Sequence, residues 1–331
     1  MRQTQTLSTA ARRRLRGDIE WPTLVLILLV YLVWGGATAF ADIIGPVAAI
    51  VAIGLATTLH SSLQHEVLHG HPLPSRRLSV ALVFPAIGYV IPYERFRDLH
   101  LAHHHDERLT DPYDDPESNY LDPAVWVHLP GPVRAILRAN NTLLGRVTIG
   151  PALGLGCFLA GEVRALARGD RAVWRAWGLH ALGLVPVAAW LGAMGTAVWW
   201  ELAAGAYLGL SILRIRTFLE HRACESVPGR SVIIEDRGPL ALLFLNNNFH
   251  ALHHAAPRMP WYRLPAVYAA RRADILRRNG GYVFRSYAEV AARYLLRRKD
   301  PVAHPLMPVP AAGQQRAAEP VETAAPAPDQ G

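Results

Sequence analysis

Residues 44–69 read IGPVAAIVAIGLATTLHSSLQHEVLH. The first part of this stretch, roughly Ile44–Leu63, is almost wholly apolar and contains no Asp, Glu, Lys or Arg. About 20 apolar residues are enough to cross the hydrocarbon core of a bilayer. The second part ends in two histidines with the spacing HxxxH, His65 and His69. The stretch therefore predicts a transmembrane helix that is followed at once by a pair of candidate metal ligands.

Further apolar runs predict two helical hairpins in the membrane. The run Trp21–Phe40 contains no charged residue, and its connection to Ile44–Leu63 contains Asp42 but no Lys or Arg. The runs Leu179–Trp199 and Leu202–Leu219 form a second pair, and their connection also contains no basic residue. We therefore predict an all-α integral membrane protein with about four transmembrane helices.

The composition agrees with this class and argues against several others. Of the 331 residues, 18% are charged, whereas about 25% are charged in an average soluble domain. The net charge of +8 is not accompanied by a basic stripe with interleaved aromatic residues, which argues against a nucleic-acid partner. Cys157 and Cys224 are far apart, which argues against a disulfide framework, a Cys zinc site and an iron–sulfur cluster. Leu78–Pro92 is short and interrupted by Pro and Gly, so we predict a re-entrant or interfacial segment.

Basic residues are unevenly distributed about the predicted spans. Residues 1–20 contain five arginines, most of the others lie in residues 95–175 or after Arg222, and the two hairpin connections contain none. The positive-inside rule then places both termini and the large polar regions in the cytoplasm, and we expect the membrane to be the bacterial inner membrane. We predict a basic cytosolic arm over 1–20, a membrane domain over 21–300, and a Pro- and Ala-rich disordered tail over 301–331.

Nine of the fifteen histidines fall in four groups on the predicted cytoplasmic side. Residues spaced i, i+3 and i+4 lie on one face of a helix, so HxxxH and HxxHH each direct their rings towards a common point. Imidazole binds iron, copper, zinc and nickel, and nine rings are more than one ion can take. We therefore predict a site for two metal ions, and its candidate ligands are His65, His69, His100, His103, His104, His221, His250, His253 and His254.

The order HxxxH, HxxHH, HxxHH across paired apolar runs resembles the membrane fatty acid desaturases and the related acyl hydroxylases, over roughly residues 20–300. In that family the histidine boxes hold two irons, and a further histidine in an Arg-x-x-x-Glu-His-like stretch completes the site. His221 matches that position in the stretch from Arg216. The resemblance implies a mushroom-like helical bundle with a cytosolic cap over four spans. It also implies oxygen-dependent desaturation of a fatty acyl chain or acyl lipid, a reaction of lipid metabolism.

The resemblance also bears on the electron supply. The chain contains no His-Pro-Gly-Gly cytochrome segment and no Cys-rich ferredoxin segment. A separate ferredoxin- or cytochrome-like protein is therefore the expected electron donor.

Three alternatives remain open at this point. A di-iron site of the same kind also supports hydroxylation of an acyl chain or membrane lipid. His65–His69 also reads HExxH, the motif of zinc proteases in which Glu66 would be the general base, although one catalytic zinc needs only three protein ligands. The third alternative is a metal carrier or membrane scaffold, but the predicted spans contain few polar residues for an ion path.

Metal-bound imidazoles usually donate their second N–H to a carboxylate or carbonyl. Candidates near the boxes in sequence are Glu66, Asp98, Asp106, Glu220 and Asn246–Asn248. An acidic stretch follows the second box, and we expect it to be a solvated turn; its members are Asp111, Asp114, Asp115 and Glu117. We expect no ligand role for the remaining histidines, which are His60, His71, His105, His128, His180 and His304.

Overall fold

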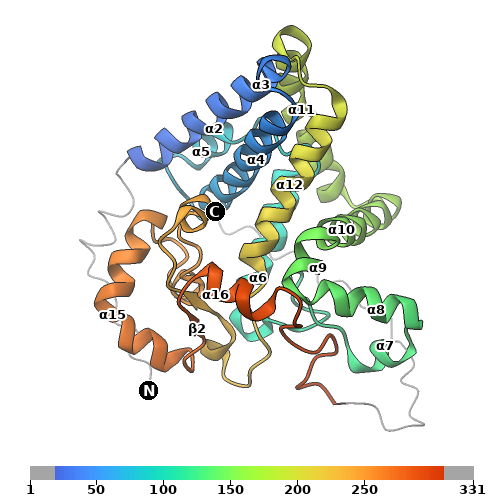
Figure 1. The fold of residues 1–331 in the computed structure, drawn as a ribbon, viewed down its shortest axis with the longest axis vertical. Coiled ribbons are helices and arrows are strands. Elements are labelled where there is room, and N and C mark those ends of the chain that lie inside the picture. Colours follow the sequence, from blue (N-terminus) through green and yellow to red (C-terminus); the bar gives the residue numbers. More distant parts are fainter. Residues whose placement is uncertain (1–18, 309–331) are drawn as a thin grey trace.

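The computed structural model describes residues 19–308, which are mostly helical (Figure 1). Four long helices form an elongated bundle in which α4 packs against both α2 and α12. Three of them, α2, α4 and α11, are long and apolar enough to cross a membrane. The prediction of a helical protein with membrane-spanning segments is confirmed to this extent. The four helices are α2 (Trp21–Ala39), α4 (Pro46–Leu68), α11 (Arg171–Met194) and α12 (Trp199–Thr217).

The boundaries of α11 show that the predicted span Leu179–Trp199 was wrong at both ends. The helix starts at Arg171 because the carboxylate of Asp170 accepts hydrogen bonds from two amides of the first turn, at 2.9 and 3.2 Å. It ends at Met194, before Gly195. Hydropathy locates the apolar part of a helix, whereas the cap that fixes its first residue is polar and lies outside that part.

Helix α4 extends beyond the predicted span Ile44–Leu63 to Leu68. His65 therefore lies within the last turn of the apolar helix, and His69 is its C-terminal cap residue. The same rigid element crosses the bundle and holds the first two candidate ligands.

Close contact between α4 and α12 depends on small residues. A side chain added at Gly205 would overlap Ile53, and one at Gly209 would overlap the Thr57 hydroxyl. The Thr58 hydroxyl donates a hydrogen bond to the Gly209 carbonyl at 3.2 Å. Small residues allow helix backbones to approach closely in apolar surroundings, where packing supplies most of the stability. This contact fixes α12, the helix that leads to His221, against the helix that holds His65.

The two hairpin connections lie side by side at one end of the bundle. The amide of Thr196 donates to the carbonyl of Thr38 at 2.8 Å, and the amide of Asp42 donates to the Thr196 hydroxyl at 3.2 Å. The other ends of the long helices lead to the remaining elements, at the bottom of Figure 1. All four histidine groups lie at that opposite end, so the arrangement of the hairpins agrees with the order of the apolar runs.

The segment Leu78–Pro92 consists of a short helix, α5 (Arg76–Leu82), and an irregular loop that is packed into the bundle. The hydroxyl of Tyr31 donates to the Leu82 carbonyl at 2.9 Å, and the amide of Ala86 donates to the Gly183 carbonyl at 3.0 Å. Because both partners lie well inside α2 and α11, the loop reaches the level of the long helices. Non-helical backbone at that depth is tolerated when protein groups satisfy its hydrogen bonds.

Short elements form a second layer below the bundle. The strands β1 (Ile233–Ile234) and β2 (Val283–Phe284) pair in parallel and form a two-stranded sheet. The remaining elements are α6 (Tyr93–His103), η1 (Asp106–Arg108), α7 (Pro123–His128), α8 (Gly131–Asn140), α9 (Leu143–Thr148), α10 (Gly150–Ala167), η2 (Val227–Arg230), α13 (Pro239–Leu243), α14 (His250–Ala255), η3 (Trp261–Arg263), α15 (Leu264–Arg278) and α16 (Tyr287–Tyr294). A further short helix, α3 (Ala41–Ile44), lies in the first hairpin connection at the other end of the bundle (Figure 1).

The segment after α16 is packed rather than separate from this layer. Leu121 exchanges backbone hydrogen bonds with Val302 and His304, at 2.9 and 2.8 Å. The ring of His304 contacts the Thr110 hydroxyl at 3.2 Å. Residues 301–308 thus belong to the folded part, which places the predicted boundary at residue 300 too early. The rest of the predicted tail and residues 1–18 of the predicted arm lie outside the described residues.

A buried ion pair connects α6 to α10 and α11. The guanidinium of Arg95 donates to both carboxylate oxygens of Glu162 at 2.9 to 3.0 Å, and the Trp177 indole N–H donates to the same carboxylate at 2.9 Å. Glu162 is 4% exposed. Removing one partner of such a pair leaves a buried charge uncompensated.

We therefore expect Glu162→Ala to destabilise the protein by about 3 kcal/mol, because Arg95 and Trp177 lose their common acceptor. Thermal unfolding of the purified protein in detergent measures this. Glu225→Ala is the matched control, since Glu225 is exposed. Equal unfolding temperatures for the two variants would contradict the assigned role of the pair.

Candidate metal centre

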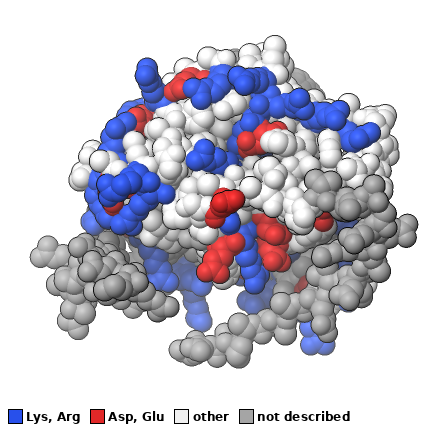
Figure 2. All heavy atoms as spheres, turned by 90° about the horizontal axis from the view of Figure 1, so that it is seen from below, with Lys and Arg blue, Asp and Glu red and all other residues white. Residues whose placement is uncertain are grey.

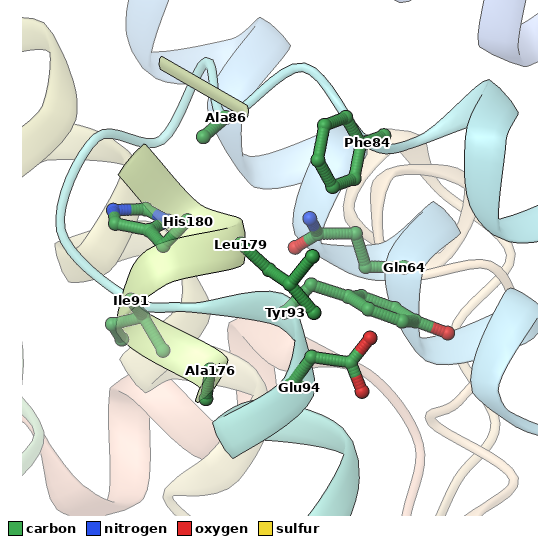
Figure 3. Close-up of a pocket in the computed structure, with 9 residues that line it drawn as sticks. All are labelled: Gln64, Phe84, Ala86, Ile91, Tyr93, Glu94, Ala176, Leu179 and His180. Carbon is green, nitrogen blue, oxygen red and sulfur yellow. The ribbon is translucent and has the colours of Figure 1, made fainter. Parts of the chain in front are cut away.

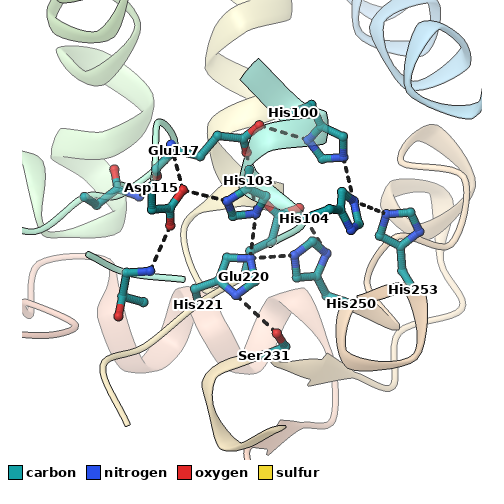
Figure 4. Close-up of polar contacts among 12 residues, drawn as sticks. His100, His103, His104, Asp115, Glu117, Glu220, His221, Ser231, His250 and His253 are labelled. Atoms are coloured by element: carbon teal, nitrogen blue, oxygen red, sulfur yellow. Dashed lines mark hydrogen bonds and ion pairs between the residues drawn. The ribbon is translucent and has the colours of Figure 1, made fainter. Parts of the chain in front are cut away.

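The structure brings all nine predicted histidines together in two adjacent groups. Figure 4 shows part of this cluster, with histidines of both groups. Within each group one ring nitrogen from every histidine lies within 4.8 Å of all the others. The first group has five members, His65, His69, His100, His104 and His253. The second has four, His103, His221, His250 and His254.

Helices α6 and α14 each supply both groups, in opposite ways. On α6, which ends at His103, the first and third histidines of HxxHH enter the first group and His103 enters the second. On α14, the first and third histidines enter the second group, whereas His253 enters the first. Residues i and i+4 are almost aligned along a helix, while residue i+3 is rotated to the other side of that line. One HxxHH box can therefore serve two neighbouring metal ions.

The two groups share a boundary. The rings of His104 and His254 stack there, with centroids 4.4 Å apart. Within the groups, ring nitrogens approach one another closely: Nε2 of His104 lies 2.9 Å from Nε2 of His100, and Nε2 of His221 lies 2.9 Å from Nε2 of His250. A spacing of about 3 Å is the distance expected between two nitrogens that bind one ion at about 2.1 Å.

Acceptors on the opposite ring nitrogens orient several of these imidazoles. Nδ1 of His100 lies 2.9 Å from Glu117, and Nδ1 of His103 lies 2.8 Å from Asp115. Nδ1 of His250 lies 3.2 Å from the Asn247 amide oxygen. When Nδ1 donates its proton to such an acceptor, Nε2 presents a lone pair. Lone pairs that face each other at 2.9 Å repel unless a cation lies between them.

Two further ring nitrogens support the same conclusion. The Nε2 atoms of His65 and His69 are buried and have no hydrogen-bond partner among residues 19–308. A buried polar atom without a partner is costly, and a metal ion would satisfy both. The donor set is imidazole throughout, which suits iron, copper, zinc or nickel. The residues present therefore fit two transition-metal ions.

Electrostatics in the cluster favour neutral rings with a cation beside them. Burial, followed by the neighbouring histidines, holds the pKa values of His221, His250 and His253 well below the usual range. At His103 burial acts in the same direction, but the carboxylates of Glu117 and Asp115 outweigh it and raise the pKa to about 9. The same negative charge would attract a metal ion to the Nε2 side of His103.

Asp115 and Glu117, in the acidic stretch after the second box, belong to the site, so this part of the stretch is not the solvated turn that was predicted. One oxygen of Asp115 accepts from the Thr110 amide at 2.8 Å, and the other accepts from the Glu117 amide at 2.9 Å and from His103. Asp115 is 5% exposed. A short loop thus positions both carboxylates that contact the second box.

Proximity in sequence was a poor guide to these partners. Asp98 faces outwards and pairs with Arg97 at 2.6 Å, and Glu66 lies 4.0 Å from His71. Glu220 does approach the site, 3.6 Å from His250. Ser231 contacts Nδ1 of His221 at 3.2 Å and was not predicted. The Asp106 side chain lies outside the described residues.

A cavity of about 840 Å³ connects the membrane helices to the metal centre. Its apolar lining includes Leu210 and Leu213 of α12 and Phe158 of α10, and it reaches Glu117 and His221 at the centre. A space of this size with an apolar part and access to the histidines suits an acyl chain.

A second pocket, between α4, α6 and α11, is far smaller, with a volume of about 20 Å³ (Figure 3). Gln64, Tyr93 and His180 line it, and none of the nine clustered histidines does. The space holds about one water molecule. The Tyr93 hydroxyl is buried and lacks a hydrogen-bond partner among the described residues, so one water there would satisfy it. This pocket is therefore too small for a substrate.

Comparison with protein-family models identifies a match. The family model described as "Fatty acid desaturase" matches residues 41–286, well over half of the chain. The matched region contains all four histidine groups. No curated protein sequence matches the chain.

Proposed function

This chain belongs to the fatty acid desaturase family, as its resemblance predicted, and we propose that it desaturates a fatty acyl chain or acyl lipid with two irons and molecular oxygen. The observation that carries the proposal is the convergence of nine histidines from four separate segments into adjacent groups of five and four. A single catalytic metal uses about three protein ligands, so this set is sized for two ions.

The two groups define the proposed ligand sets. His65, His69, His100, His104 and His253 would hold one iron, and His103, His221, His250 and His254 would hold the other. When bound, a pair of irons supplies the one-electron and oxygen chemistry needed to break an unactivated C–H bond, which amino acid side chains cannot do by acid–base chemistry.

The protein contributes orientation and exclusion of water. Asp115 and Glu117 fix the ring orientation of His103 and His100 through their Nδ1 atoms. The close packing of α4 and α12 fixes the two segments that carry His65 and His221. The apolar walls of the large cavity would keep an acyl chain against the centre and separate it from bulk water.

Hydroxylation of an acyl chain or membrane lipid is the second candidate, because the same ligands and the same cavity suit both outcomes. We expect lipid mass spectrometry of cells with and without the gene to show a product that has lost two hydrogens. A product that has gained one oxygen, with no loss of hydrogen, would instead assign hydroxylation.

The arrangement around HExxH does not favour a zinc protease. His65 and His69 lie with three further histidines rather than with one additional ligand. The carboxylate of Glu66 has its ion-pair contact with His71, 4.0 Å away. The family match independently supports oxidation rather than proteolysis.

We propose four spans, with α12 as the fourth, and a cytoplasmic metal centre beneath them. Helix α12 carries Glu201, Arg214 and Arg216, which explains why composition alone does not mark it as a span. It nevertheless packs along α4 in the bundle. Basic side chains are spread over the face seen from below, with fewer acidic side chains among them (Figure 2). This supports the positive-inside orientation, and we propose the bacterial inner membrane as the location.

A topology experiment tests this orientation. Reporter tags at residue 1 and residue 331 are expected to report the cytoplasm, and a tag inserted after Asp42 is expected to report the opposite side. The reason is that the connections at residues 40–45 and 195–198 lie together at the end of the bundle away from the histidines. A cytoplasmic signal from the tag after Asp42 would contradict the proposed topology.

We propose that a separate ferredoxin- or cytochrome-like protein supplies electrons from the cytoplasm. Helix α15 offers an exposed basic surface for an acidic donor, in which Arg271, Arg277 and Arg278 share one carboxylate, that of Asp274. Complementary charge of this kind mainly increases the rate of association.

The proposed domain limits are a basic arm over 1–20 and a membrane domain from 21 that includes residues up to 308.

A further inference from the structure

The large cavity contains two arginines, Arg146 of α9 and Arg214 of α12, that have no carboxylate partner among residues 19–308. Arg146 is 4% exposed and donates only to uncharged oxygens, those of Asn119 and of the Asn140 backbone. Arg214 is partly buried and makes no hydrogen bond within the described part of the chain.

Several other cations in or beside the same cavity are matched with an acid, and one more lining arginine, Arg168, is exposed to solvent. Arg95 pairs with Glu162 at 2.9 Å, and Arg216 pairs with Glu220 at 3.0 Å. Lys299 pairs with Asp300 at 3.3 Å. The acids nearest the metal centre, Asp115 and Glu117, are occupied by histidine rings. Arg146 and Arg214 are therefore the lining arginines that are at least partly buried and have no acid in ion-pair contact among residues 19–308, although the carboxylates of Glu117 and Glu220 act on Arg214 from a greater distance.

The two arginines lie next to each other along α10. A side chain at Gly150 would lie 3.2 Å from Cδ of Arg146, and one at Gly154 would overlap Nη2 of Arg214. Positions i and i+4 are neighbours on one helix face, with Cβ atoms about 6 Å apart. Both arginine side chains thus lie over the same face of α10, and the absence of side chains at the two glycines makes room for them.

Placing two like charges together away from water is unfavourable unless an anion joins them. Burial, followed by the charge of Arg214, lowers the pKa of Arg146 to about 10. Guanidinium groups match the geometry of carboxylate and phosphate oxygens. The remainder of the cavity wall includes Leu210, Leu213 and Phe158, which suit an alkyl chain rather than a second polar group.

We propose that Arg146 and Arg214 form the site for the anionic end, a carboxylate or phosphate, of an amphipathic substrate whose alkyl chain occupies the apolar part of the same cavity. This inference rests on the proposed function, because the cavity becomes a substrate site only if it serves the metal centre at Glu117 and His221. It specifies an acidic lipid as the preferred substrate, with weaker binding of a neutral hydrocarbon or alcohol of the same chain length.

Equilibrium binding of three probes with the same chain tests the proposal: octadecanoate, octadecyl phosphate and octadecanol. Binding is measured without oxygen to the purified full-length protein in a neutral detergent. We expect both anions to bind wild-type protein at least about tenfold more tightly than the alcohol, because charge-assisted hydrogen bonds are stronger than neutral ones. Equal binding of all three would overturn the proposal.

Substitutions test whether the preference for the anions depends on the two arginines. Arg146→Gln and Arg214→Gln are each expected to remove most of the preference for the anions and leave alcohol binding unchanged. Arg164→Gln is the matched control, because Arg164 is exposed on α10 and does not line the cavity. Retention of the full preference in both cavity variants, or an equal loss in the control, would contradict the assignment.

Further measurements keep the proposal testable if one of the variants misfolds. Alcohol binding reports an intact cavity in each variant. If Arg146→Gln fails to fold, Arg214→Lys and Gly154→Ala provide the test instead. Arg214→Lys keeps the charge and is expected to retain part of the preference for the anions. Gly154→Ala displaces the Arg214 guanidinium and is expected to reduce that preference. An unchanged preference in Gly154→Ala and in Arg214→Gln would overturn the proposal.

The same assay, with inorganic phosphate as a further probe, distinguishes a lipid headgroup from free phosphate as the bound anion. Binding of inorganic phosphate alone, with no gain from an attached chain, would assign the site to free phosphate and overturn the headgroup assignment. Because the binding assay requires no turnover, a failure of anion binding contradicts only the headgroup site and not the proposed oxidation. Conversely, the absence of an oxidation product contradicts the proposed oxidation and does not change the binding result.

Discussion

Replacing His103 or His253 by alanine is expected to abolish product formation and to lower bound iron from about two ions per chain to about one. The two residues belong to different groups, the second and the first. Each is at most 2% exposed, so bulk solvent does not readily supply a replacement ligand. Loss of the residue that orients a ligand typically lowers metal affinity or activity by about 10- to 100-fold. Loss of the ligand itself should cost more, so we expect activity to fall by more than about 100-fold.

Iron analysis of purified variants and product analysis in cells measure this result. His128→Ala is the matched control, because His128 is exposed on α7 and outside both groups. It should keep full iron and full activity. Substantial product from His103→Ala or His253→Ala would contradict the ligand assignment. Stoichiometric single zinc in wild-type protein that was purified without metal stripping would overturn the di-iron proposal itself.

The sequence predicted the hairpins well because burial in a bilayer requires long apolar runs, which are visible without any tertiary information. Helix ends were less predictable. The start of α11 is fixed by the cap at Asp170, and the end of α4 runs past the apolar run into His65. The packing of Val302 against Leu121 was missed for a different reason. Backbone pairing between distant segments leaves no trace in local composition.

The nine histidines were predictable because their spacing follows the period of a helix. Their division between the two groups was not, since it depends on how α6 and α14 face each other. His250 and His253 join different groups although only one helical turn separates them. Which segments face each other across the site is decided by packing in the bundle, such as the contact of Gly209 with Thr58.

The acidic residues that orient the histidines show most clearly what could not be predicted from the sequence. Asp98 lies two residues before the second box and contributes nothing to it, whereas Asp115 lies twelve residues after His103 and contacts it directly. The loop returns because its own backbone amides, those of Thr110 and Glu117, bind the Asp115 carboxylate. A sequence pattern of acidic residues does not distinguish such a loop from a solvated turn.

Asp115→Asn is therefore expected to reduce iron occupancy and product formation by about 10- to 100-fold. Both oxygens of Asp115 accept hydrogen bonds: one from Thr110, and the other from Glu117 and His103. Asparagine has one oxygen and one NH2 group, so in either orientation a donor would face a donor. The Nδ1 proton of His103 or the loop amide of Thr110 must lose its acceptor. The loss of negative charge also weakens the attraction of a cation to His103.

Asp98→Asn is the matched control, because it makes the same chemical change beside the same box, at an exposed residue paired with Arg97. Its iron content and product should equal those of the wild type. Thermal unfolding of both variants separates a loss of orientation from a loss of fold. A variant that unfolds at the wild-type temperature but has lost iron supports the orienting role. Full iron and full activity in Asp115→Asn would show that the packed histidines hold their orientation without this carboxylate, and the proposed role of the loop would fail.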